Sequence, residues 1–286
     1  MTDAEFLRYL AAKRTVDDRA LNRVVWDALA REIPGRSAGP KILDIGCGIG
    51  TMLERILDWR LASRVSYTGV DASRVCIEHA REHLPRRVGD PGVTVELLEA
   101  DFYDLPARLP GRRWDLVVAH AFIDIVEVSR ALPVMTSLLV PGGLLLLSIA
   151  FDGVTALEPV VDPVLDRRIE DAYHGTMDTR LIEGRPSGDS RTGRHLLVNL
   201  TRAGVPIVEA GASDWVVFAR DGAYTGDEAF FLRAIVETMA GAVRGHPAIA
   251  ASELEGWRKA RLAQIDRGEL VYLAHQLDVL ARVAQG

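Results

Sequence analysis

Three glycines at alternate positions follow a short apolar run that ends in an acid, in the segment ILDIGCGIG. Glycine inside a regular element costs about 0.5–1 kcal/mol relative to alanine, so Gly46, Gly48 and Gly50 indicate that side chains are kept away from this backbone. The dinucleotide pattern G-x-G-x-x-G is absent, because its third glycine would fall at Thr51. The pattern that is present, D-x-G-x-G-x-G beginning at Asp44, could pass under a ligand that offers no phosphates.

Two further acids follow later apolar runs. Asp71 ends VSYTGVD, twenty-one residues after Gly50, and Asp101 lies thirty residues later in EADFYDL. A carboxylate at a sheet edge could accept both hydroxyls of a ribose, while Asp101 could accept the amino hydrogens of adenine and Phe102 could cover the ring. Each acid could equally cap a helix. Taken together, the order and spacing of these features favour a nucleoside site.

Short strand-like runs alternate with helical ones around these residues. The strand candidates are 41–46, 65–71, 93–101, 114–121 and 143–151, and the helical candidates are 51–60, 74–84 and 133–140, with Pro133 opening the last. Near-continuous apolar strands between helices are typical of a parallel sheet covered on both faces. We therefore expect an α/β fold, a doubly wound, mostly parallel, seven-stranded Rossmann-like sheet with a helical cap or lid. Ligands of such sheets bind beyond the carboxyl ends of the strands.

The remaining segments are expected to complete the sheet and to cover it. One amphipathic helix is expected from Val16 to Ile33, two closing antiparallel strands in VPIVEAG and SDWVVFA, and a helical tail that includes LVYLAHQLDVLARV. The expected division is an N-terminal helical cap at 1–35, an α/β ligand-binding core at 36–153, a lid insertion at 154–188, completion of the sheet at 189–220 and a C-terminal helical segment at 221–286.

Composition excludes several classes of protein. The chain has 286 residues, 48% of them apolar and 26% charged, with a formal net charge of -6. These values exclude a disordered chain and disfavour nucleic acid as a partner. Cys47 and Cys76 lack metal-ligand spacing, so we expect no metal, no disulfide and a reducing compartment. No apolar stretch has the length of a membrane span or a signal peptide, so the expected location is the cytoplasm, with no membrane partner.

The segments ILDIGCGIG, YTGVDAS, EADFYDL and LLVPGGLLLLS resemble the class I S-adenosylmethionine-dependent methyltransferase family over roughly residues 40–150. This resemblance implies S-adenosyl-L-methionine as cofactor, with Gly46 and Gly48 beside its methionine part and Asp71 on its ribose. It also implies that Asp101 and Phe102 receive the adenine. The full set expected to bind the cofactor is Asp44, Gly46, Cys47, Gly48, Asp71, Ala72, Asp101, Phe102, His120 and Arg14.

Candidate acceptor residues lie after the fourth strand and in the insertion. His120 would end that strand near the sulfonium, and no tetrapeptide of the N-P-P-Y type follows it, which weakens the case for methylation of a base amine in DNA. A hydroxyl acceptor gains from a nearby base, and His120 and His174 are the candidates for that role. The candidate substrate-binding residues are Asp124, Tyr173, His174, Asp178 and Arg180. Each could instead be a solvated or internally bonded polar side chain.

The function expected from these features is methyl transfer from S-adenosylmethionine to an oxygen or nitrogen of a small molecule. Two alternatives stay open: an RNA or protein methyltransferase, which the acidic balance disfavours, and a noncatalytic nucleoside-binding protein with the same cleft. A nicotinamide-dependent dehydrogenase is opposed by the missing third glycine. The sequence carries no signal of oligomeric state or of the acceptor's identity.

Overall fold

A computed structural model describes residues 1–33, 39–87 and 92–285. Its fold is built on one mixed β-sheet. The strand order is β3-β2-β1-β4-β5-β10-β8, and β9 adds an eighth strand by pairing with β10. The strands are β1 (Lys41–Ile45), β2 (Val65–Asp71), β3 (Val93–Glu99), β4 (Trp114–His120), β5 (Leu139–Glu158), β8 (Ile207–Ala212), β9 (Trp215–Val217) and β10 (Val271–Arg282). Pairing is parallel from β3 through β5 and antiparallel around β10. The prediction of a doubly wound, mostly parallel α/β sheet is confirmed.

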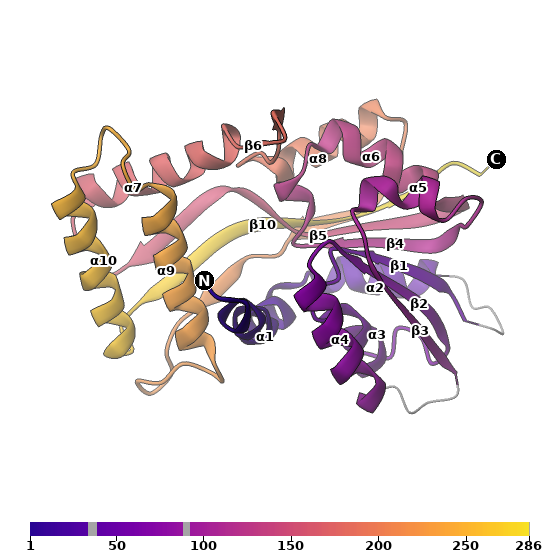
Figure 1. The fold of residues 1–286 in the computed structure, drawn as a ribbon, viewed down its shortest axis with the longest axis horizontal. Helices are drawn as coiled ribbons and strands as arrows, with labels where there is room; N and C mark the ends of the chain where they lie inside the picture. The colour runs from indigo at the N-terminus through magenta and orange to yellow at the C-terminus, as the bar shows by residue number, and fades with distance from the viewer. Residues whose placement is uncertain (34–38, 88–91, 286) are drawn as a thin grey trace.

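Helices cover both faces of the parallel strands, as Figure 1 shows. One face carries α2 (Arg23–Glu32), α3 (Thr51–Asp58) and α4 (Arg74–Arg87), and the other carries α5 (Leu105–Arg108), α6 (Val128–Ser137) and α8 (Thr192–Arg202). Leu29 of α2 and Ile56 of α3 share one buried cluster with Ile42 of β1. Leu132 of α6 and Leu196 of α8 share another cluster with strand residues of the opposite face. Burial on both faces explains why these strands are apolar almost without interruption.

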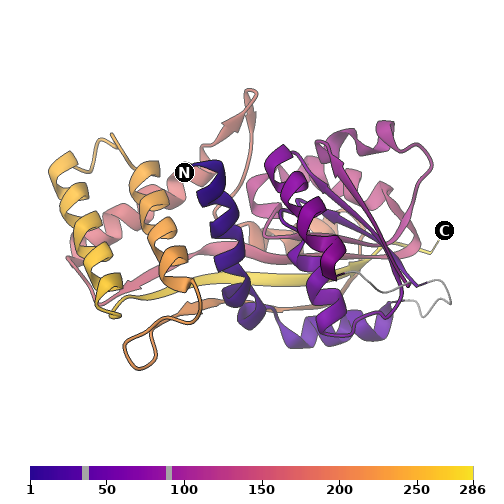
Figure 2. The ribbon, with the colours of Figure 1, turned by 60° about the horizontal axis from the view of Figure 1, so that its bottom comes forward.

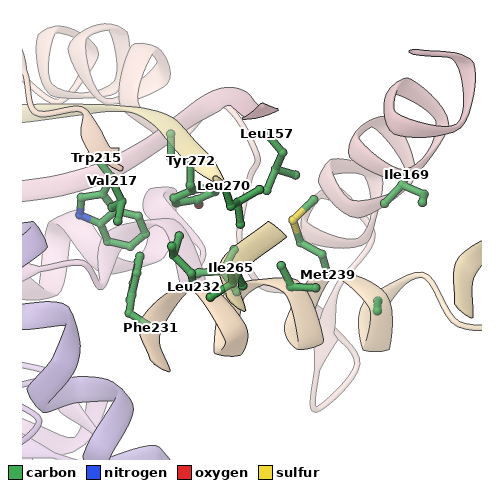
Figure 3. Packing of buried hydrophobic residues seen from close by; sticks show 14 of the residues in the cluster. Leu157, Ile169, Trp215, Val217, Phe231, Leu232, Met239, Ile265, Leu270 and Tyr272 are labelled. Carbon is green, nitrogen blue, oxygen red and sulfur yellow. The ribbon is translucent and has the colours of Figure 1, made fainter. Parts of the chain in front are cut away.

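A cap stands at one end of the sheet (Figure 1). Beyond the parallel strands, β5 and β10 continue as an antiparallel pair that reaches Glu158 and Val271. Around this end pack α7 (Pro163–Asp178), α9 (Glu228–Ala242) and α10 (Ala251–Asp266). Figure 3 shows their apolar contacts, with Phe231 of α9 facing Trp215 of β9 and Tyr272 of β10. The core and the cap therefore share the same two strands.

The first helix, α1 (Asp3–Ala20), lies between the core and the cap (Figure 2). Its Arg14 forms ion pairs with Glu54 and Asp58 of α3, and its Arg8 pairs with Asp227 before α9 at 2.7 Å. A small hairpin of β6 (Leu181–Ile182) and β7 (Arg185–Pro186) projects beside it in Figure 2. Among the described residues, no helix is both long enough and apolar enough to cross a bilayer.

Two helical predictions at the N-terminal half need correction. The expected single helix from Val16 to Ile33 is wrong, because α1 ends at Ala20 and α2 begins at Arg23. The side chain of Asn22 accepts the first amides of α2 and so favours a new helix start over continuation. Pro133 does not open its helix either, since α6 begins five residues earlier and contains it.

The expectation of a helical tail is wrong for LVYLAHQLDVLARV, which contains β10. This segment is apolar at spacings that suit both helix and strand, and the sheet decides between them because β10 fills the place between β5 and β8. The expected antiparallel pairing of VPIVEAG with SDWVVFA is also wrong, because β8 and β9 each pair with β10. The domain boundaries stay a prediction. The segments 154–188 and 221–286 nevertheless contribute to the cap, whereas α2 packs on the core sheet.

Candidate functional site

A cavity of about 730 Å³ opens at the carboxyl ends of β1, β2 and β3. This outer cavity brings together six of the residues that the sequence predicts for the cofactor: Gly46, Gly48, Asp71, Ala72, Asp101 and Phe102. Ser73, whose hydroxyl accepts from the amide of Cys76, also lines it. The β6–β7 hairpin contributes Ile182 and Arg185 to the same lining. The predicted turn, acids and aromatic ring therefore meet at one edge of the sheet, as the topology requires.

The glycine turn needs its glycines for two different reasons. Gly46, Gly48 and Gly50 all have positive φ, between 52° and 87°, which side chains disfavour. A Cβ at Gly46 would also lie 2.4 Å from the ring of Phe122, whereas a Cβ at Gly48 would meet only Leu10 at 3.5 Å. At Gly48 the lack of a side chain leaves the backbone open to the outer cavity. At Gly46 the lack of a side chain makes room for the ring of Phe122.

Asp71 ties the turn to the helix that follows β2. Its two carboxylate oxygens accept hydrogen bonds from the amides of Gly48 and Ser73, each at 2.8 Å. Burial raises the pKa of this carboxyl, although the two amides oppose the shift. The capping alternative is realised at Ser73, whose hydroxyl accepts from the amide of Cys76 in α4, whereas Asp71 accepts from amides that lie before that helix. Because a carboxylate oxygen has two lone pairs, the group that lines the outer cavity keeps acceptor capacity toward a ligand.

Asp101 and Phe102 lie on the other side of the outer cavity. Asp101 is exposed and caps the short helix η1 (Phe102–Asp104) by accepting from the amide of Tyr103 at 2.9 Å. Phe102 is buried and meets Phe122 edge to face, with ring centroids 5.4 Å apart. Sequence reasoning missed Tyr103 and Phe122, although both adjoin residues that it selected.

A second cavity of about 400 Å³ adjoins the first and lies toward the cap. This inner cavity shares Gly46, Gly48 and Ala121 with the outer one, together with Phe6 and Leu10 of α1. Its further walls combine polar and aliphatic residues with five aromatic ones: Tyr9, Phe151, Tyr173, Trp215 and Tyr272. Two non-glycine residues with positive φ, Ala121 and Ile149, also line it. Backbone strain of this kind persists where the surroundings impose it and is concentrated at functional sites.

His120 ends β4 at the inner cavity, as predicted, but both of its ring nitrogens have partners. Nε2 lies 3.0 Å from Asp17 of α1, and Nδ1 lies 2.9 Å from the hydroxyl of Ser148. Burial lowers the pKa of His120 to about 4, with the guanidinium of Arg55 acting in the same direction. A neutral imidazole bonded at both nitrogens is placed to hold α1 against the sheet, and its geometry does not favour the catalytic base that the sequence suggested.

Asp17 is the centre of this polar cluster. Besides His120 it accepts from Lys13 at 2.6 Å and from the indole of Trp215 at 2.9 Å. Burial acts to raise the pKa of Asp17, but Lys13, His120 and Arg55 outweigh it and hold the pKa below its usual range. Sequence reasoning missed Lys13 and Asp17, because charged residues on an N-terminal helix more often face solvent.

Two carboxyls at the inner cavity are strongly affected by burial. The pKa of Asp44 is raised to about 7 mainly by burial, although its Oδ2 accepts from the phenol of Tyr67 at 2.5 Å. Burial also raises the pKa of Asp124, in the short helix η2 (Ile123–Ile125) after β4. Oδ1 of each carboxyl is buried without a hydrogen-bond partner.

The insertion residues divide between the cavity and the fold. Tyr173 and Arg180 line the inner cavity, and burial raises the pKa of Tyr173 to about 12. His174 lines neither cavity and instead meets the hydroxyl of Thr155 at 3.0 Å. Asp178 holds the amide and hydroxyl of Ser190. The roles expected for His174 and Asp178 in binding substrate are therefore not supported by their positions.

Arg14 is also outside both cavities, because α3 engages its guanidinium through Glu54 and Asp58. The expectation that it reaches the cofactor carboxylate is not supported. Cys47 is buried at the inner cavity, and burial raises the pKa of its thiol. No cluster of three or more metal-binding side chains occurs in the part of the chain that the structure describes.

Comparisons with known proteins find similarity to methyltransferases over part of the chain. Residues 43–145 match a family model described as a methyltransferase domain. A 94-residue stretch is 31% identical to the malonyl-[acyl-carrier protein] O-methyltransferase of Paenibacillus sp. (strain JDR-2), and this match spans 32% of each chain, so the chain covers about a third of that relative's length.

Solved structures of low identity are also similar. An S-adenosylmethionine-dependent methyltransferase from Thiobacillus denitrificans, in complex with S-adenosyl-L-homocysteine, is 18% identical with a TM-score of 0.47, covering 91% of this chain and 92% of its own. The [4+2]-cyclase SpnF is 19% identical with a TM-score of 0.48, covering 92% of this chain and 82% of its own.

Proposed function

We propose, from the premise that residues 43–145 form a methyltransferase domain of the class I S-adenosylmethionine-dependent family, that this protein transfers a methyl group to a small molecule. The observation that carries the proposal is the pair of adjoining cavities. The outer one lies against the glycine turn and Asp71, and the inner one is lined by the cap. They share the backbone of Gly46 and Gly48, so molecules in the two cavities would meet there.

The residues of the outer cavity fit S-adenosyl-L-methionine. Asp71 retains acceptor capacity for the ribose hydroxyls, and Asp101 and Phe102 offer a polar edge and an aromatic surface to the adenine. The bare backbone at Gly48 leaves room for the methionine part, toward which the unpartnered Oδ1 of Asp44 could accept from the ammonium group. When bound, this cofactor supplies a methyl group on a positively charged sulfur.

The chain's own contribution is positioning and exclusion of water. In-line displacement requires the acceptor atom to lie behind the methyl carbon, and such positioning alone can supply about 7–11 kcal/mol of the barrier. Phe6 and Leu10 of α1 line both cavities and cover the place where they join. The cluster around Asp17 fixes α1 in this position. An inner cavity of about 400 Å³ favours a small molecule over RNA or protein as the acceptor.

Calorimetry and radiolabel transfer test the proposal. We expect the protein to bind S-adenosylmethionine and S-adenosylhomocysteine, and not nicotinamide dinucleotides. Incubation of a cell extract with the protein and S-adenosylmethionine labelled with tritium in its methyl group, followed by size fractionation, is expected to place the label in the low-mass fraction. Label confined to RNA or protein would contradict the assignment of the acceptor. Binding without any transfer would instead support the noncatalytic alternative.

A further inference from the structure

Residues of the inner cavity carry buried hydrogen-bond acceptors that have no donor. Three of the residues that line it each have one buried side-chain oxygen without a hydrogen-bond partner: Oδ1 of Asp124, Oε1 of Gln276, and Oδ1 of Asp44, which the proposed function gives to the cofactor's ammonium group. No buried nitrogen without a partner belongs to the described residues that line this cavity. A buried acceptor left unsatisfied costs about 1–3 kcal/mol, so the cavity is suited to a ligand that brings hydrogen-bond donors.

Asp124 and Gln276 lie close together through Phe151. The backbone amide of Phe151 lies close enough to the Asp124 carboxyl to oppose the rise in its pKa. In the pairing of β10 with β5, Gln276 is the Cα partner of the same Phe151. The two unpartnered oxygens therefore belong to one region of the inner cavity, on its cap side and away from the outer cavity, which neither residue lines.

The cations near Asp124 are bonded elsewhere. Arg180 donates from Nε to the carbonyl of Ser187 at 2.8 Å. Its Nη2 makes only a long contact, of 3.4 Å, with the backbone carbonyl of Asp124. Lys13 is held by Asp17 at 2.6 Å. Both cations and the phenol of Tyr173 interact electrostatically with Asp124, yet none of them donates a hydrogen bond to its Oδ1.

The charges and the walls of the inner cavity are compatible with a cationic ligand. Two carboxylates, Asp17 and Asp124, balance the two cations Lys13 and Arg180, and Asp44, whose pKa burial raises to about 7, adds a negative charge when it ionises. The aromatic rings around them can contact the apolar body of a ligand and favour a cation near their faces. A carboxylate with aromatic neighbours suits an ammonium group better than a hydroxyl or an acid.

We propose that the methyl acceptor is a primary or secondary amine with an apolar body, and that Asp124 binds its nitrogen. This inference rests on the proposed function and deepens it. The amine arrives protonated, and Asp124 accepts one proton from it, which frees the nitrogen lone pair. The lone pair forms the bond to the methyl carbon while the carbon–sulfur bond breaks and leaves its electron pair on sulfur. The N-methyl product departs as an ammonium ion, and Asp124 returns its proton to solvent.

The test compares matched ligands in the presence of S-adenosylhomocysteine, so that binding is read without turnover. Arylalkylamines with one to four methylenes are each paired with the alcohol and the carboxylate of the same skeleton. Calorimetry is expected to show that the best amine binds at least tenfold more tightly than its alcohol. In Asp124→Asn the preference is expected to fall below about twofold, while the affinity for S-adenosylhomocysteine changes less than twofold.

Asp171→Asn, a carboxylate on the exposed side of α7, is the matched control and is expected to keep the wild-type preference. The wild-type comparison of amine with alcohol stands even if Asp124→Asn fails to fold. Tighter binding of alcohols or acids, no binding of any amine, or an unchanged preference in Asp124→Asn overturns this inference alone. Failure of the wild type to bind S-adenosylhomocysteine overturns the proposed function with it.

Discussion

At the scale of the residue, Asp71 has two tasks that can be separated by experiment. It accepts from the backbone on either side, and it lines the outer cavity. Asp71→Asn keeps the size of the side chain and removes its charge. Since a hydrogen bond to a charged group contributes about 1.5–3 kcal/mol, we expect the affinity for S-adenosylmethionine in calorimetry to fall roughly ten- to a hundredfold.

The control for Asp71 is Asp27→Asn on α2, an exposed carboxylate far from the cavity lining in sequence and fold. Its affinity should match the wild type. An Asp71→Asn protein that binds as tightly as the wild type would remove the assignment of Asp71 to the ribose and leave only its hydrogen bonds to the backbone.

His120 predicts a pH dependence of stability. Burial lowers its pKa to about 4 from 6.5, so between these values the unfolded chain binds a proton that the folded chain does not. Stability therefore rises with pH across this window, by up to about 1.4 kcal/mol per pH unit from this residue. Urea unfolding between pH 4.5 and 7 measures this effect in the wild type and in His120→Gln. The free energy of unfolding should rise less steeply with pH, or fall more steeply, in the variant than in the wild type.

Asp44 changes the pH dependence of stability in the opposite direction, so the wild type must be compared with His120→Gln. Its pKa is raised to about 7, so its contribution to stability is full near pH 4 and declines as the pH rises. This decline is present in both proteins, and the difference between their slopes isolates His120. Equal slopes would show that His120 titrates normally in the folded protein.

Residues of the outer cavity could be predicted from the sequence because each lies at the end of a predicted strand, and these strands alternate with helices along one stretch of the chain. Gly46, Asp71 and Asp101 each follow an apolar run, so spacing alone assigns them to one edge of the sheet. The inner cavity could not be predicted in this way. Its walls come from distant segments, and aromatic residues such as Trp215 are of types that fill cores whether or not a ligand is present.

At the scale of the element, the glycine turn can be tested by adding one methyl group. Gly46→Ala places a Cβ at positive φ and against Phe122. The left-handed backbone costs about 1–2 kcal/mol, and overpacking adds about 1–3 kcal/mol. We expect urea unfolding to show a loss of stability close to the sum.

Gly226→Ala is the matched control, because Gly226 also has a positive φ, of 54°, but open space where its Cβ would lie. It should lose only the backbone contribution. Equal losses in the two variants would show that Phe122 moves aside freely and that the turn does not depend on the close approach.

Two strands, β2 and β10, differ in how well the sequence pattern predicts them. Residues 65–71 were predictable as β2 to the residue, because a parallel strand between two helices has an unambiguous apolar run. The segment of β10 has the same composition as a buried helix, and only its place between β5 and β8 makes it a strand. Pairing over such long separation in sequence leaves no local mark that a spacing rule could detect.

At the scale of the whole molecule, the cap and the core should unfold together. In the cap, Asp166 of α7 accepts from the indole of Trp257 and the guanidinium of Arg261, both at 2.7 Å. Asp166→Ala leaves Arg261 buried without that partner, and breaking a buried pair costs about 3–5 kcal/mol. Because β5 and β10 belong to both parts, we expect one transition, shifted alike in tryptophan fluorescence and in far-ultraviolet circular dichroism.

Asp171→Asn on the same helix should leave that transition in place, since its side chain is exposed. Two separated transitions in Asp166→Ala, with fluorescence changing first, would show instead that the cap melts as an independent unit.

The position of β10 also governs how the chain matures during synthesis. Residues 271–282 occupy the gap between β5 and β8, yet they are made after α9 and α10. Until they emerge from the ribosome, β5 exposes an open edge of twenty residues and β8 has no neighbour. A nascent chain in this state is a template for wrong strand pairing, so chaperone binding should persist until residues 271–282 have left the ribosome.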